Sequence, residues 1–194
     1  MQTISDEYRA MQHRLHAERN DYGVAALQFA VDISRLISEN GIREVLDYGA
    51  GKGRLGQCLK AGHALDVREY DPAIPAWAAT PEPAELVCCI DVLEHIEPEF
   101  LDGVLDELRR LTLRVGFFTV HTGPAAKALA DGRNAHLIQQ PPSWWMPKLL
   151  ERFELAFFNR NPQGFTVIVE PQAGVALQAS SLGAMTKQAV AQAA

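Results

Sequence analysis

The sequence predicts an α/β domain in which a mostly parallel sheet lies between two layers of helices, a three-layer α/β/α sandwich. Three observations lead to this prediction. Strand-like and helix-like segments alternate from residue 24 onward. The continuous apolar run 85–91 is typical of a strand buried on both faces of a parallel sheet. A glycine-rich turn follows the first strand-like segment, as in sheets that bind ligands at their carboxyl edge.

The segment 1–40 is predicted to form a helical arm. Residues 5–20 are polar and have a helical pattern, and residues 24–39 form an amphipathic helix that ends at Asn40. The apolar face of this second helix consists of Phe29, Ile33, Leu36 and Ile37. A short strand that ends at Asp47 follows the arm.

The remaining elements continue the alternation. Helices are expected over 54–61, 98–111 and 144–153, and strands over 64–71, 85–91, 114–120, 153–159 and 165–170. The turn Asn161-Pro-Gln-Gly164 joins the last two strands as a hairpin, which predicts one antiparallel strand in the sheet. We therefore expect one domain over 1–171, followed by an Ala- and Gln-rich tail over 172–194.

Composition and charge limit the function classes. Apolar residues make up 47% of the 194 residues, which is typical of a globular domain, and the net charge is −6. An acidic chain disfavours broad electrostatic binding to nucleic acid or to an anionic membrane. No apolar run is long enough for a spanning helix, and no export signal is evident. The three cysteines, Cys58, Cys88 and Cys89, are expected as reduced thiols, which indicates a cytoplasmic protein.

The turn after the first strand has an unusual spacing of acid and glycines. Asp47 precedes Gly49, Gly51 and Gly53, which stand at alternate positions. Glycines allow a ligand to approach the backbone closely, since no Cβ intervenes. An acid before the first glycine would repel a pyrophosphate but attract an ammonium group. A second acid, Asp71, ends the next strand 24 residues later, where a carboxylate can accept hydrogen bonds from both ribose hydroxyls.

The stretch 44–53 resembles motif I of class I S-adenosylmethionine-dependent methyltransferases, a Rossmann-like family. The resemblance implies that S-adenosylmethionine is the cofactor, that Asp47 lies near its methionine end, and that Asp71 binds the ribose. Asp91 and Val92 open an Asp-x-Leu-Glu-His segment similar to one that lies beside the cofactor in many members. The whole chain is similar to small phage-type and bacterial members of undefined substrate.

The chain departs from the family between 72 and 84. Only thirteen residues, four of them prolines, stand where the family has a helix and its third strand. We therefore expect that third strand to be reduced or missing. Ile74, Trp77 or Val92 would then cover the adenine ring in place of the usual residues.

Candidates for the chemistry come from the second half of the chain and from the arm. His121 and His136 are the expected general bases, because imidazole titrates near neutral pH. The expected substrate contacts are Tyr22 in the arm, Arg133 and Asn134 in a polar loop, and Trp144. The arm would close over the cofactor as a lid, and no metal ligand is assigned.

Three functions are therefore considered. The preferred one is methyl transfer from S-adenosylmethionine to a small or compact polar acceptor. The second is a metal-assisted RNA ribose 2′-O-methyltransferase, because Asp91, Glu94, His95 and His136 resemble the acid-x-x-Glu-His…His arrangement of those enzymes. The third is a non-catalytic module that binds the cofactor. A nucleic-acid partner is possible under the second function but is not favoured.

Overall fold

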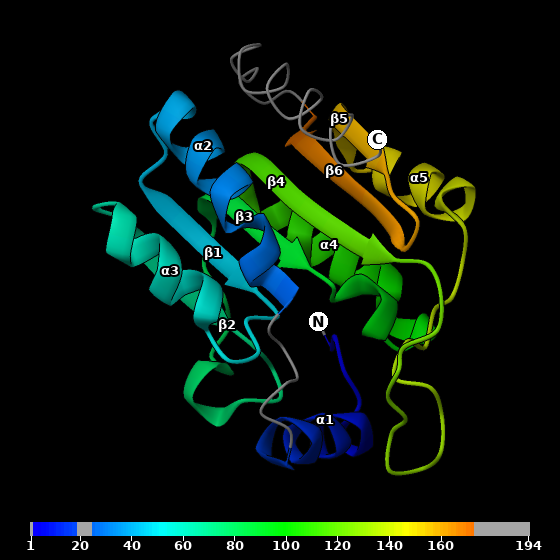
Figure 1. The fold of residues 1–194 in the computed structure, drawn as a ribbon. Coiled ribbons are helices and arrows are strands. Elements are labelled where there is room, and N and C mark those ends of the chain that lie inside the picture. Colours follow the sequence, from blue (N-terminus) through cyan, green and yellow to red (C-terminus); the bar gives the residue numbers. More distant parts are fainter. Residues whose placement is uncertain (1, 19–24, 173–194) are drawn as a thin grey trace.

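The computed structural model describes residues 2–18 and 25–172. A six-stranded sheet with the order β2-β1-β3-β4-β6-β5 forms its centre, and helices cover both faces (Figure 1). The strands are β1 (Glu44–Tyr48), β2 (Asp66–Tyr70), β3 (Ala84–Ile90), β4 (Thr112–His121), β5 (Phe153–Arg160) and β6 (Gly164–Pro171). The helices are α1 (Asp6–Glu18), α2 (Ala30–Asn40), α3 (Arg54–Gly62), α4 (Leu101–Leu111) and α5 (Pro142–Leu150), with 3₁₀ turns η1 (Ala25–Phe29), η2 (Pro75–Trp77), η3 (Leu93–His95) and η4 (Pro98–Phe100).

The strand directions confirm the predicted fold class. Strands β2, β1, β3 and β4 are mutually parallel, whereas β6 runs antiparallel to both β4 and β5. The hairpin thus contributes one reversed strand to a parallel sheet. Between β2 and β3 the described chain forms only the short turn η2, so the third family strand is missing. Prolines account for this, because they lack the N–H that a sheet ladder requires.

Two apolar clusters hold the sheet to its helices, one on each face. Helix α4 shows the principle best, because its five apolar residues recur at helical spacing and are at most 3% exposed: Leu101, Val104, Leu105, Leu108 and Leu111. Helix α5 packs beside it, and α2 and α3 cover the opposite face. The neighbouring Cys88 and Cys89 are buried free thiols in opposite clusters, as side chains that alternate along a strand must be.

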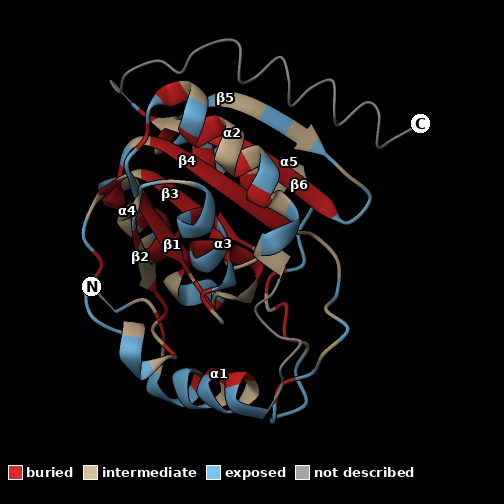
Figure 2. Ribbon diagram, turned by 60° about the vertical axis from the view of Figure 1, so that its left-hand side comes forward, coloured by how far each residue is buried: buried red, intermediate tan, exposed pale blue. Residues whose placement is uncertain are grey.

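Helix α1 stands apart from these layers. It crosses the region beyond the carboxyl ends of the parallel strands and is exposed over much of its surface (Figures 1 and 2). We call α1 the roof helix. The rest of the predicted arm behaves differently, because α2 packs on the sheet through Ile33, Leu36 and Ile37. The predicted tail beyond residue 172 lies outside the described residues. None of the helices in the described ranges is both long and apolar enough to cross a membrane.

Candidate functional site

A cavity of about 410 Å³ lies between the roof helix and the carboxyl ends of the parallel strands. Its size suits a small-molecule site, and its position is where α/β sheets bind ligands. The predicted residues that line it are Asp47, Gly49, Gly51, Asp71, Asp91, Val92, His121 and His136. The fold therefore brings most of the predicted cofactor-binding residues and both predicted bases to one cavity.

The glycine turn forms one wall of this cavity. Gly49, Gly51 and Gly53 have φ values of +76°, +54° and +63°, a left-handed region that side chains disfavour. The N–H groups of Gly49 and Ala50 donate to the Tyr70 carbonyl at 2.8 and 3.0 Å, which fixes the turn to the end of β2. A Cβ on Gly49 would collide with the Val92 side chain. Both the backbone conformation and the packing therefore require glycine at position 49.

Asp47 places a carboxylate at the inner end of the cavity. It is 3% exposed, and its Oδ2 has no hydrogen-bond partner among the described residues. Burial raises its pKa to about 7, and the neighbouring carboxyl groups of Glu69 and Asp71 add to the shift. A buried carboxylate of this kind is stabilised by a cation, and an ammonium group would supply both the charge and the missing hydrogen bond.

Asp71 lies at the end of the neighbouring strand and supports the glycine turn. Its Oδ2 accepts the Gly51 N–H at 3.1 Å, and its Oδ1 accepts the Ala73 N–H at 2.9 Å. Each carboxylate oxygen has a second lone pair, so both can still accept a hydroxyl hydrogen bond. The carboxylate thus shapes the turn and also faces the cavity.

The roof helix closes the cavity with polar residues. Its buried side chains, Tyr8, Gln12 and His16, lie four residues apart on one face and line the cavity. The Tyr8 hydroxyl donates to the His95 carbonyl at 2.7 Å, and the Gln12 amide donates to the Tyr8 hydroxyl. At the other end of the helix, the Lys52 ammonium group donates to the His16 carbonyl. The glycine turn is therefore bonded directly to the roof.

The amino end of the roof is anchored by a single carboxylate. The backbone N–H and the hydroxyl of Ser5 donate to the two oxygens of Glu97 at 2.8 and 2.6 Å. The Ser5 hydroxyl also accepts the Tyr8 N–H at 3.1 Å and so caps the helix. Glu97 is 7% exposed, so this contact is shielded from water. The roof is thus held by directional polar contacts as well as by the small apolar cluster around Ile4 and Leu129.

Three histidines form the wall opposite the glycine turn. The rings of His95 and His121 lie 4.7 and 4.8 Å from that of His136, measured between centroids. Burial, followed by the neighbouring His136, lowers the pKa of His95 to about 3, and burial also lowers the pKa of His136. These two rings are therefore neutral near pH 7, the form in which an imidazole can accept a proton.

Asp91 carries backbone strain beside this wall. It is the one non-glycine residue with a positive φ, +52°, in the described ranges. Its N–H and its Oδ1 both bond to the Thr119 hydroxyl at 3.0 Å, which holds it in this conformation. Such strain is concentrated at functional sites. Asp91 and His121 also line a second hollow of about 250 Å³, so the two spaces adjoin there.

Solved structures of other proteins share this architecture. A 1,6-didemethyltoxoflavin-N1-methyltransferase from Burkholderia thailandensis, with 1,6-didemethyltoxoflavin and S-adenosylhomocysteine bound, matches with a TM-score of 0.62 and 18% identity over 88% of this chain and 92% of its own. The DhpI–SAH complex matches with a TM-score of 0.56 and 19% identity, over 85% and 93% of the two chains. This is the class I methyltransferase fold.

The likeness holds for the fold and does not extend to the sequence. An O-methyltransferase family protein from Burkholderia thailandensis matches with a TM-score of 0.60 at 15% identity, over 84% of this chain and 61% of its own. No protein-family model matches the sequence, and no curated protein is detectably similar to it. The resemblance that motif I indicated is therefore confirmed as a likeness of fold.

Within the class I methyltransferase fold, several predicted site residues lie away from the cavity. Gly53 lies under the ring of Trp77, and neither residue lines the cavity. Trp77 thus packs on the turn, and Ile74 also lies outside the lining. Of the three residues expected to cover the adenine, Val92 alone is among those that line the cavity.

The predicted substrate contacts also fall elsewhere. Arg133 is exposed and pairs with Asp131 at 2.7 Å. Asn134 is used inside its loop, where its Oδ1 accepts the N–H groups of Ala125 and His136, both at 2.9 Å. Trp144 packs against the core in α5 with Lys148 above its ring. These side chains shape the loop and the α5 packing and do not line the cavity. Tyr22 lies outside the described residues.

Other lining residues were not identified from the sequence as site residues. Gln12 belongs to the roof, and the segment from Pro124 to Lys127 closes the side of the cavity. Tyr8, Gln12 and His16 stand four residues apart in the sequence, a spacing that places them on one helix face. Polar residues at this spacing more often form a face exposed to solvent, so the spacing alone did not mark them as site residues. The segment 124–127 gives no comparable signal.

Proposed function

We propose that the protein transfers a methyl group from S-adenosylmethionine to a small or compact polar acceptor. The observation that carries this proposal is that two buried carboxylates and a glycine-rich turn line one cavity. Asp47 has an oxygen without a hydrogen-bond partner among the described residues, which suits an ammonium group, and Asp71 suits a ribose diol. The S-adenosylhomocysteine complex of the Burkholderia methyltransferase and the DhpI–SAH complex, which share this fold, support this cofactor.

The cofactor supplies a methyl group that its sulfonium already activates. The residues of this chain would then orient the acceptor, exclude water and remove a proton. The acceptor would lie at the wall of histidines. There His121, or His136 in a protein without a bound metal ion, would accept the proton that the acceptor loses as its bond to the methyl carbon forms and the carbon–sulfur bond breaks. The roof helix would keep water out of the closed cavity. Proximity and orientation would supply much of the rate.

The acceptor class follows from the size and polarity of the remaining space. Beyond the glycine turn, the cavity adjoins the second hollow at Asp91 and His121. Phenylalanine side chains form part of the lining of that hollow, and the amide side chains of Asn159, Asn161 and Gln163, which can both donate and accept hydrogen bonds, form another part. A compact polar molecule fits such a lining. The acidic net charge of −6 disfavours a nucleic acid as the acceptor.

Calorimetry with S-adenosylmethionine tests the proposal. Asp71→Ala removes the carboxylate that would hold the ribose, and we expect the Kd to rise at least tenfold, which corresponds to about 1.4 kcal/mol. Asp66→Ala, at the exposed opposite end of β2, is the matched control and should leave the Kd unchanged. Failure of the unaltered protein to bind, or equal affinities for all three proteins, would contradict the proposal. Turnover with a panel of small acceptors would then identify the product and exclude a purely binding role.

A further inference from the structure

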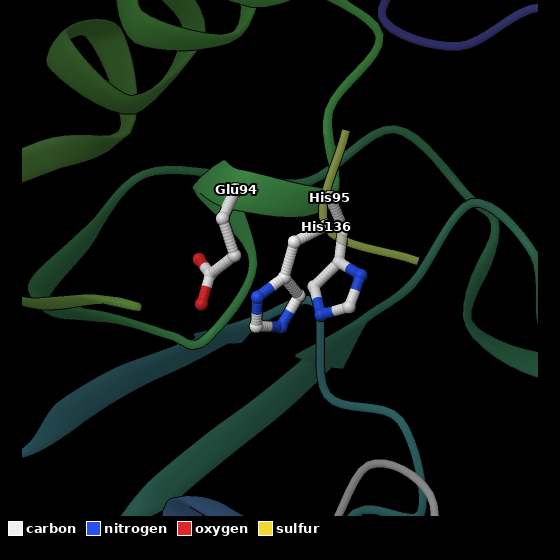
Figure 3. A group of neighbouring side chains, drawn as sticks. All are labelled: Glu94, His95 and His136. Carbon is white, nitrogen blue, oxygen red and sulfur yellow. The ribbon is translucent and has the colours of Figure 1, made fainter. Parts of the chain in front are cut away.

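Glu94, His95 and His136 bring three potential metal ligands together beside the cavity. One ligand atom from each side chain lies within 4.8 Å of the others, and the ring of His136 lies between Glu94 and His95 in the view of Figure 3. Glu94 and His95 come from the turn η3 after β3, whereas His136 comes from the loop between β4 and α5, 41 residues further along the chain. The fold itself therefore creates this group.

The contacts of both histidines favour the tautomer in which Nε2 is the potential metal ligand. The Nδ1 of His95 lies 2.7 Å from the Ala135 carbonyl, and the Nδ1 of His136 lies 2.7 Å from the Gly123 carbonyl. A carbonyl can only accept, so each Nδ1 carries the proton and each Nε2 keeps its lone pair. Metal-bound histidines commonly donate their other ring N–H to a backbone carbonyl in this way.

Glu94 supplies an unsatisfied carboxylate oxygen to the same place. The residue is 0% exposed, and its Oε1 accepts the His121 N–H at 2.9 Å. Its Oε2 has no hydrogen-bond partner among the described residues. A fully buried polar atom without a partner requires a physical explanation, and a bound cation is one of the few available. A cation would satisfy this oxygen and balance its charge.

We propose that Glu94, His95 and His136 bind one divalent first-row transition-metal ion, with Zn²⁺ as the reference ion. Two imidazoles and one carboxylate form a set of three ligands that leaves a coordination position open. That position would face the cavity, because His95 and His136 line it while Glu94 closes the site from behind. Metal–ligand bonds of about 2.0–2.2 Å require the three side chains to move closer by small rotations.

The preferred sequence interpretation assigned no metal ligand, whereas the metal-assisted alternative drew on Asp91, Glu94, His95 and His136. The structure brings three of these four residues together and leaves Asp91 out of the group. The proposed metal site depends on the three side chains and their two carbonyl partners, and it does not depend on methyl transfer. A protein that binds the ion but not S-adenosylmethionine would therefore support the metal site while contradicting the proposed function. A protein that binds S-adenosylmethionine but not the ion would contradict the metal site and leave the proposed function supported.

Metal titration of the tag-free full chain tests the site. After chelator treatment and dialysis, Zn²⁺ is titrated by calorimetry and Co²⁺ by its visible absorption bands. We expect one ion per chain and Co²⁺ bands typical of nitrogen and oxygen ligands. Glu94→Gln and His136→Ala should each weaken binding at least tenfold. His63→Ala, which alters a histidine at the end of α3, should bind as the unaltered protein does.

Several results would overturn the site. These are absence of stoichiometric binding by the unaltered protein, unchanged binding by both ligand variants, and equal loss of binding in His63→Ala. Circular dichroism and thermal unfolding without metal show whether each variant is folded. If Glu94→Gln does not fold, His136→Gln and the Co²⁺ spectrum of the unaltered chain decide the matter. A metal-induced rise in the melting temperature that the His136 variant lacks would add independent support.

Discussion

The two faces of the sheet and its carboxyl edge are built in opposite ways. The faces are apolar, and α4 alone buries five aliphatic side chains against the strands. The edge is polar, and the roof helix buries Tyr8, Gln12 and His16 there. The strands make their backbone hydrogen bonds within the sheet. At the edge, one oxygen of Asp47 and one of Glu94 have no hydrogen-bond partner in the part of the chain that the structure describes. The faces therefore provide the stability. The buried polar groups at the edge destabilise the fold, and this cost is tolerated because these groups can bind a ligand.

The magnitudes support this division. Full burial of one aliphatic side chain contributes about 1.5–3 kcal/mol, so α4 alone can contribute on the order of 10 kcal/mol before entropy is counted. A hydrogen bond contributes a net of about 0.5–1.5 kcal/mol. The roof, which depends largely on such bonds, should therefore open locally without unfolding the sheet.

The largest effect is expected from a change in the core of α4. Leu105→Ala removes a fully buried side chain and should lower the free energy of unfolding by about 2–5 kcal/mol, since it leaves a cavity between α4 and the sheet. Urea denaturation measures this loss. Leu113→Ala, in the strand β4 that follows α4, alters a leucine that is 51% exposed; it is the matched control and should change stability by less than about 0.5 kcal/mol. Similar losses for both variants would invalidate the contrast.

An intermediate effect concerns the buried acid at the edge. The pKa of Asp47 is raised to about 7, above its value of about 4 in an unfolded chain. The folded, ligand-free protein therefore binds the extra proton between these values. Its contribution to stability is present at acidic pH and is lost as the pH rises through about 7. Asp47→Asn should flatten this part of the stability–pH profile, as measured by denaturation between pH 5 and 8.

The same carboxyl group should couple cofactor binding to protons. An ammonium group beside Asp47 favours the ionised form, so binding at pH 7 should release about half a proton. Calorimetry in buffers of different ionisation enthalpy measures this release. The affinity should also increase as the pH rises from about 6 to about 7.5. Binding that releases no proton and does not depend on pH would show that the ammonium group lies elsewhere.

The smallest effect on stability is expected at the anchor of the roof. Glu97→Gln weakens the charged hydrogen bonds to Ser5, so amides in residues 6–18 should exchange faster with solvent. Global stability should fall by no more than about 1 kcal/mol, because the sheet is unaffected. The control is Glu99→Gln, an exposed residue of the same turn. Faster exchange throughout the sheet would mean that the roof and core unfold together.

The sequence predicted the elements of the sheet closely. The expected helix over 54–61 and strand over 85–91 correspond to Arg54–Gly62 and Ala84–Ile90. The four prolines between 72 and 84 correctly predicted a missing strand. These features are local, since they depend on side-chain periodicity, on backbone freedom at glycine and on the absent N–H of proline. The carboxylates of Asp47 and Asp71 were also predicted to share a site, because each lies at the end of a strand and parallel strands end at the same edge of the sheet.

Only the tertiary structure decided which of the remaining polar residues reach the cavity. Asn134 was expected to contact substrate but bonds within its loop, whereas Gln12, in a helix that the sequence marks only as polar, faces the cavity. The convergence of Glu94 and His95 with His136 likewise depends on the path of a long loop. Local pattern fixes where a strand ends and which way its side chains alternate, but the position of a loop or of the roof depends on contacts between residues far apart in the chain, and no sequence period encodes them.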